Sequence, residues 1–112
     1  MTSLETLAKQ VHEITVNKGF WDGFHELEPF PFYAYKLAMI NSEVTEVLEA
    51  IRKDKGDEEV VLEIVDILIR VLDLYEGLKN TKEIEDTWDL DAMMAKKIVV
   101  NQARPERHGV RG

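Results

Sequence analysis

VVLEIVDILIRVLDL, residues 60–74, is the stretch of sequence that decides the fold. Apolar side chains take most of the circumference of this predicted helix, and the polar ones fall within an arc of roughly 80°. The polar residues in this stripe are Glu59, Glu63, Asp66, Arg70 and Asp73. A helix that is apolar on so many sides is expected to be buried on most of them. Three other short helices cannot cover that much apolar surface. The stretch therefore predicts an all-α fold, a helical bundle that is completed by oligomerisation.

Helical spacing and terminal signals predict four helices in the chain. We expect them at about residues 3–18, 32–53, 58–78 and 90–102. Thr2 and Glu5 match a capping box at the first start, Gly19 stops that helix, and Asp89 can cap the last one.

Two segments between these helices have no helical pattern. Residues 19–32, GFWDGFHELEPFPF, contain glycine and proline punctuators and predict a structured loop that carries Phe20, Trp21 and Phe24. Residues 80–87 are either a loop or a short helix, so the total is four to five helices.

Composition indicates one globular domain, residues 1–112, with a hydrophobic content of 45% and a charged content of 32%. No cysteine is present, so a disulfide framework and a thiolate metal site are excluded. The N-terminus lacks the apolar core of a signal peptide, and charges interrupt the longest apolar stretch. We therefore expect a soluble, cytoplasmic protein that does not span a membrane.

Charge is distributed unevenly along the chain. The net charge of −8 argues against binding to nucleic-acid polymers. Residues 96–112 nevertheless carry five basic side chains and one acid, and a basic tail begins at about residue 103. This tail either contacts an anionic ligand or is an ordinary solvated terminus.

Two pairs of carboxylates stand out on the central helices. Glu43 and Glu46 lie one turn apart on the second helix, as do Glu63 and Asp66 on the third. Partly buried carboxylates repel one another, and a divalent cation offsets that repulsion. Hard oxygen ligands favour Mg²⁺ or Mn²⁺ over zinc, and no histidine follows a glutamate at the spacing of a helical di-iron site.

The alternative for these carboxylates is a solvated face, because acidic pairs at this spacing arise by chance in so acidic a chain. Arg70 could also neutralise the stripe by pairing with Asp66 or Asp73.

The same residues resemble a known family. Glu43-x-x-Glu46, followed after sixteen residues by Glu63-x-x-Asp66, is similar to the E-x-x-E…E-x-x-D signature of MazG-like all-α nucleoside triphosphate pyrophosphohydrolases. Residues 97–109, KIVVNQARPERHG, resemble the K-x-x-x-N-x-x-RP-x-x-HG ending of small MazG-like proteins. KGFWD and IRVLDL agree as well, so the resemblance covers about residues 18–109.

The resemblance implies Mg²⁺-dependent hydrolysis of (deoxy)nucleoside triphosphates to the monophosphate and pyrophosphate, with Mn²⁺ as a possible substitute. It also implies a house-cleaning role in the nucleotide pool. The mostly apolar helix at residues 58–78 independently indicates a homodimer or a dimer of dimers. The residues that would hold the metal and serve catalysis are Glu43, Glu46, Glu63 and Asp66.

Substrate contacts are implied for Lys97 and Asn101, with Arg104 as a third candidate, and Asp73 would support metal or substrate. Trp21 is a further candidate for substrate binding because of its aromatic ring. Lys97 and Asn101 lie one turn apart on the last helix, where both could reach phosphates or sugar. Trp21 either packs in the core or stacks on a base. The tail departs from the commoner family pattern at Gln102, Ala103 and Glu106.

Two rival hypotheses remain. One is a non-catalytic helical interaction module of the same fold, and the other is a metal-binding helical protein without nucleotide chemistry. The complete carboxylate signature favours the enzyme over the first rival, and the basic tail favours it over the second.

Overall fold

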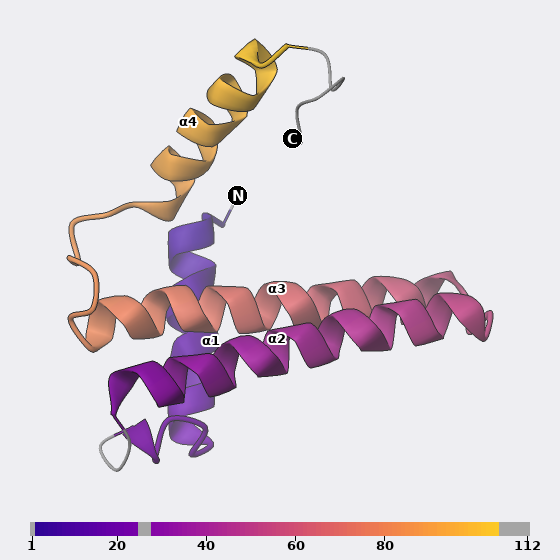
Figure 1. Cartoon of the computed structure of the whole chain (residues 1–112), viewed down its shortest axis with the longest axis horizontal. Coiled ribbons are helices and arrows are strands. Elements are labelled where there is room, and N and C mark those ends of the chain that lie inside the picture. Colours follow the sequence, from indigo (N-terminus) through magenta and orange to yellow (C-terminus); the bar gives the residue numbers. More distant parts are fainter. Residues whose placement is uncertain (1, 25–27, 106–112) are drawn as a thin grey trace.

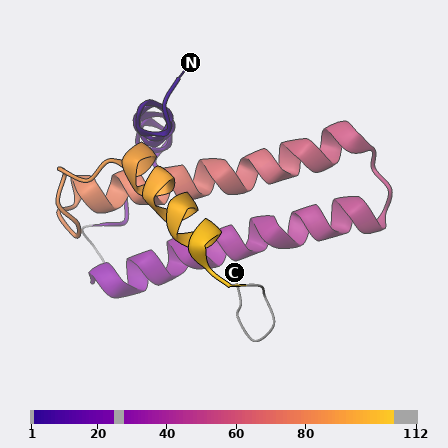
Figure 2. The same cartoon turned by 90° about the horizontal axis from the view of Figure 1, so that it is seen from above.

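The computed structural model describes residues 2–24 and 28–105, and every regular element in them is a helix (Figure 1). The helices are α1 (Leu4–Asn17), α2 (Pro29–Arg52), α3 (Asp57–Asn80) and α4 (Leu90–Ala103). The two long helices α2 and α3 run antiparallel, α1 crosses them, and α4 projects away from the pair (Figures 1 and 2). The prediction of an all-α fold is confirmed.

The helix starts differ slightly from those expected. α1 is capped by Ser3, whose Oγ accepts a hydrogen bond of 3.0 Å from the amide of Thr6. The capping box of Thr2 and Glu5 is therefore wrong, because the Glu5 carboxylate accepts instead from Lys79 Nζ of α3 at 2.8 Å. α1 ends as predicted, with Gly19 at φ +87°, a backbone conformation that favours glycine.

α2 begins at Pro29, three residues earlier than expected. Proline is well suited to the first helical turn because its missing N–H has no helical partner there. Residues 81–89 contain turns and no helix, so the described residues 2–24 and 28–105 form four helices rather than five. Asp89 caps α4 as predicted and accepts from the amide of Ala92 at 2.9 Å.

Trp21 connects the loop after α1 to the helices. Its side chain is buried, and its ring lies 4.9 Å from that of His12 and 5.3 Å from that of Phe32. A Cβ at Gly77 of α3 would come within 2.1 Å of the indole, so the ring packs in a gap that only glycine leaves open. This contact fixes the loop against α1, α2 and α3.

A single chain leaves a large apolar surface uncovered. The buried hydrophobic residues among those described are Ala8, Trp21, Phe32, Ala50 and Leu72. Large apolar side chains are exposed along all three later helices, and examples are Leu48, Ile51, Val61, Leu68, Ile98 and Val99. Extensive apolar patches of this kind mark interfaces. None of the described helices is long and apolar enough to cross a membrane.

Candidate functional site

Three carboxylates converge where α2 passes α3. One oxygen from each of Glu43, Glu63 and Asp66 lies within 4.8 Å of the other two. Glu43 and Glu63 are half-buried, and Asp66 is exposed. A compact set of carboxylate oxygens from two rigid helices matches the ligand chemistry of Mg²⁺ or Mn²⁺.

Glu46, the fourth predicted ligand, is exposed and lies outside this group of three. Its negative charge is still close enough to raise the pKa of Glu63. Partial desolvation raises the pKa of Glu63, and a hydrogen bond with Glu59 and the charges of Asp66, Glu59 and Glu46 raise it further. The ionised form of Glu63 is therefore disfavoured by its surroundings, as expected for crowded carboxylates.

Arg70 supplies the counter-charge. Its Nε donates a hydrogen bond of 3.0 Å to Glu43 Oε1, across the gap between α3 and α2. Arg70 thus pairs with Glu43 rather than with Asp66 or Asp73, the partners considered from the sequence.

A cavity of about 210 Å³ opens beside the carboxylates. Its lining residues are Thr15, Phe20, Glu43, Asp66, Ile69, Arg70 and Asp73. A second cavity of about 250 Å³ shares Phe20 and Arg70 and is lined in addition by Gly19, Tyr35, Lys36 and Met39. Of the three carboxylates, those of Glu43 and Asp66 therefore line a recess whose wall also includes Phe20 and Arg70.

Asp73, expected to support metal or substrate, is the centre of a buried hydrogen-bond network. Its Oδ1 accepts from Thr15 Oγ1 at 2.5 Å and from Trp21 Nε1 at 3.0 Å, and it lies 2.8 Å from His12 Nδ1. Burial alone would raise the pKa of Asp73, but these hydrogen bonds and the nearby Lys36 leave it below its ordinary value. Asp73 is thus held as a carboxylate between α1 and α3, at one edge of the cavity.

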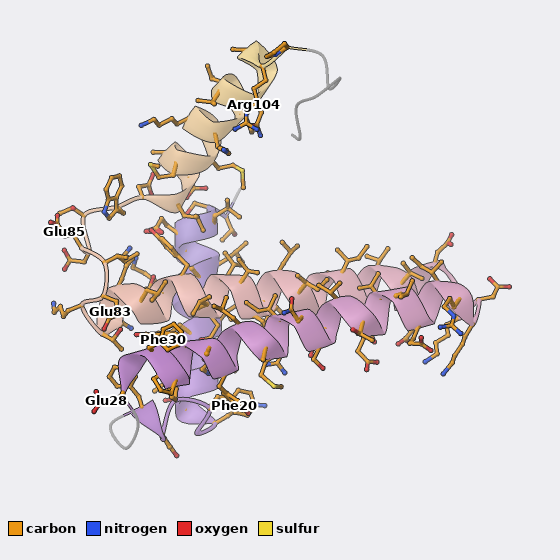
Figure 3. All side chains as sticks on the ribbon, in the orientation of Figure 1. Phe20, Glu28, Phe30, Glu83, Glu85 and Arg104 are labelled. Atoms are coloured by element: carbon orange, nitrogen blue, oxygen red, sulfur yellow. The ribbon has the colours of Figure 1, made fainter. Side chains whose placement is uncertain are left out.

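Lys97, Asn101 and Arg104 are not brought to the carboxylates within one chain. All three are exposed on or just after α4, and none of them lines either cavity. Arg104 and Phe20 lie on opposite sides of the α2–α3 pair (Figure 3). The basic tail beyond residue 105, which includes Glu106, lies outside the described residues.

Sequence reasoning missed Lys36. Its buried Nζ donates to the carbonyl oxygen of Phe20 at 3.0 Å and lies 3.8 Å from Asp73 Oδ2. Burial lowers the pKa of Lys36. One signal was available: Lys36 precedes Glu43 by two helical turns, which places both on the same face of α2.

Trp21 and Phe20 have different surroundings. The Trp21 ring is buried against Gly77, as the packing alternative expects, and its N–H bonds to Asp73. Phe20 is half-exposed at 54% and is the aromatic side chain on the cavity wall.

No family model, curated protein or solved structure matches this chain.

Proposed function

We propose that this protein is a Mg²⁺-dependent nucleoside triphosphate pyrophosphohydrolase that releases a nucleoside monophosphate and pyrophosphate, with a house-cleaning role in the nucleotide pool. The observation that carries the proposal is the convergence of Glu43, Glu63 and Asp66 beside a cavity. The same three residues are members of the MazG-like signature. The geometry adds to the sequence pattern, because a residue spacing does not by itself require side chains on two helices to meet.

In the proposed mechanism, Glu43, Glu63 and Asp66 hold the metal. Bound Mg²⁺ would neutralise phosphate charge and lower the pKa of the attacking water. Glu46, whose charge acts on Glu63, would complete the ligand set or accept the proton of that water. Because phosphoryl transfer depends on positioning and charge neutralisation, rigid helices that present the ligands suit this chemistry.

Phe20 is the residue that we propose for contact with the base. Its exposed ring borders the carboxylate cavity, while Lys36 fixes its carbonyl oxygen and so the backbone that carries it. Stacking on an aromatic ring contributes roughly 1–3 kcal/mol per base and tolerates different bases. Trp21 would then act indirectly, by anchoring the loop from beneath.

A second copy of the chain would cover the exposed apolar faces and complete the site. Stable dimers commonly bury at least about 1,200 Å² in total, and the uncovered helices α2, α3 and α4 offer extended apolar surface for this. Because α4 rises away from its own carboxylates, we propose that Lys97, Asn101 and Arg104 serve the site of another subunit (Figure 3).

The first prediction concerns the products. Incubation with Mg²⁺ and each ribo- and deoxyribonucleoside triphosphate should yield a monophosphate and pyrophosphate for at least one substrate, resolved by ion-exchange chromatography. Water attacks the α-phosphorus in this reaction, and the bond to the bridging oxygen of pyrophosphate breaks. Diphosphate with orthophosphate would instead indicate attack at the γ-phosphorus and contradict the mechanism.

A panel without any turnover would favour one of the rivals. The interaction module predicts no response to divalent metal, whereas the metal-binding protein predicts binding without hydrolysis.

The second prediction concerns assembly. Light scattering coupled to gel filtration should give two or four times the 12.9 kDa mass of one chain. Burial of apolar surface drives such association at about 25 cal/mol per Å² before the costs of docking. A stable monomer at micromolar concentration would contradict this arrangement.

A further inference from the structure

Arg70 is the cation that pairs with one of the three carboxylates, that of Glu43. Its pair with Glu43 is only partly buried, with 33% of the Arg70 side chain and 16% of the Glu43 side chain exposed. Its Nε bond to Glu43 is its only hydrogen bond in residues 2–24 and 28–105, so the terminal guanidinium nitrogens have donors to spare there. A partly exposed ion pair of this kind is weak and can exchange partners.

Arg70 lies between two neighbouring cavities, so a second partner is within its reach. It lines both the carboxylate cavity and the neighbouring cavity, where Lys36 is a second cation. Lys36 is already engaged with the Phe20 carbonyl and lies close to Asp73. Two cations on one cavity wall repel each other and are stabilised by an anion between them.

Building on the proposed hydrolase function, we propose that Arg70 exchanges partners during binding: it neutralises Glu43 in the metal-free protein and binds a phosphate group of the substrate in the loaded site. A divalent cation held by Glu43, Glu63 and Asp66 competes for the Glu43 carboxylate and repels the guanidinium. A phosphate placed beside that cation then offers the planar fork of arginine a bidentate partner.

The proposal predicts opposite effects on two binding reactions when Arg70 is replaced by glutamine. Mn²⁺ alone, titrated calorimetrically, should bind Arg70→Gln about tenfold more tightly than wild type, because a competing unit charge has been removed. The Mg²⁺ complex of pyrophosphate should bind the variant roughly 10- to 100-fold more weakly, because charge-assisted hydrogen bonds are lost. Arg70→Lys, which keeps the charge but loses the fork, should change Mn²⁺ affinity little and weaken pyrophosphate binding less.

A matched control is available on α2. Arg52 pairs with Glu49 at 3.1 Å and is mostly exposed, away from the three carboxylates. Arg52→Gln removes a similar ion pair and should alter neither affinity. Circular dichroism of the metal-free proteins checks whether each variant is folded. If Arg70→Gln is unfolded, the pyrophosphate measurement is made with Arg70→Lys instead.

The outcomes separate this proposal from the hydrolase function. Unchanged or weaker Mn²⁺ binding by Arg70→Gln overturns the exchange, even if the wild type hydrolyses nucleotides. Undiminished pyrophosphate binding by either variant overturns it too, as does a wild type that binds no Mn²⁺. Opposite shifts in a protein without turnover leave the exchange standing and refute the hydrolase.

Discussion

Glu63→Gln and Asp66→Asn are each expected to abolish turnover and to leave the metal-free fold at least as stable as wild type. Each variant removes one of three converging ligands, so activity should fall about a hundredfold or more, since a catalytic metal contributes several kcal/mol. In the metal-free protein, desolvation and neighbouring carboxylates raise the pKa of Glu63. Because the folded-state pKa of Glu63 is raised, the free energy of unfolding decreases as the pH rises through that pKa. Glutamine does not ionise, so the variant avoids this decrease.

Thermal unfolding with and without metal gives a second measure of the same variants. Mg²⁺ or Mn²⁺ should raise the melting temperature of wild type, because a ligand that binds only the folded state stabilises it by about 2.7 kcal/mol at one hundred times its Kd. The two variants should lose much of that increase. Glu58→Gln, an exposed change on the same helix and outside the three ligands, should keep both the increase and the activity.

The alternative of a solvated acidic face makes different forecasts. Carboxylates on such a face tolerate substitution within about 0.5 kcal/mol and show no specific response to divalent metal. Retained activity in Glu63→Gln and Asp66→Asn, with an unchanged metal-induced shift, would end the metal-site hypothesis.

The helices were predictable because their signals are local. The periodicity of residues 60–74 defines α3, and Gly19 and Asp89 mark helix ends through backbone conformation and side-chain capping. The errors arose where two local solutions compete. Ser3 and Thr2 both carry a capping hydroxyl, and Pro29 is compatible with a loop as well as with a first helical turn.

Contacts between helices were less predictable. The pair of Glu43 with Arg70 spans 27 positions, and that of His12 with Asp73 spans 61. The helical wheel placed Asp73 correctly in the polar stripe, but it cannot show that α1 crosses α3 there and surrounds the carboxylate with donors. The direction of α4 depends likewise on the turns of residues 81–89, which have no periodic pattern.

Asp73→Asn is expected to destabilise the fold by about 3 kcal/mol or more, the usual cost of breaking a buried ion pair or network. The asparagine amide leaves the buried Lys36 without its countercharge. It also places an N–H₂ group next to donors such as Trp21 Nε1, which in wild type donate to the carboxylate. Urea denaturation followed by circular dichroism measures the loss. Asp86→Asn, in the exposed loop before α4, is the control and should change stability by less than about 0.5 kcal/mol.

The pH dependence of the stability difference between wild type and Asp73→Asn tests whether the ionised Asp73 carboxylate causes it. The folded-state pKa of Asp73 is lowered, chiefly because hydrogen bonds from His12, Thr15 and Trp21 outweigh the effect of burial. Its stabilisation is therefore complete above the unfolded-state pKa of about 3.9 and is lost as the pH falls through the lower folded-state value. The gap between wild type and Asp73→Asn should be constant near neutrality and narrow under acid conditions.

Asp73 could instead serve mainly as a ligand for metal or substrate, as the family resemblance implies. In that case Asp73→Asn would keep the stability of the metal-free protein and lose the metal-induced rise in melting temperature. Thr15→Val, which deletes the 2.5 Å hydrogen bond without touching the carboxylate, separates the two roles. It should cost about 1–2 kcal/mol if Asp73 organises the core, because one buried charge-assisted bond is lost. It should cost little if the carboxylate acts mainly on ligands, because the stability of the metal-free fold would then not depend on that bond.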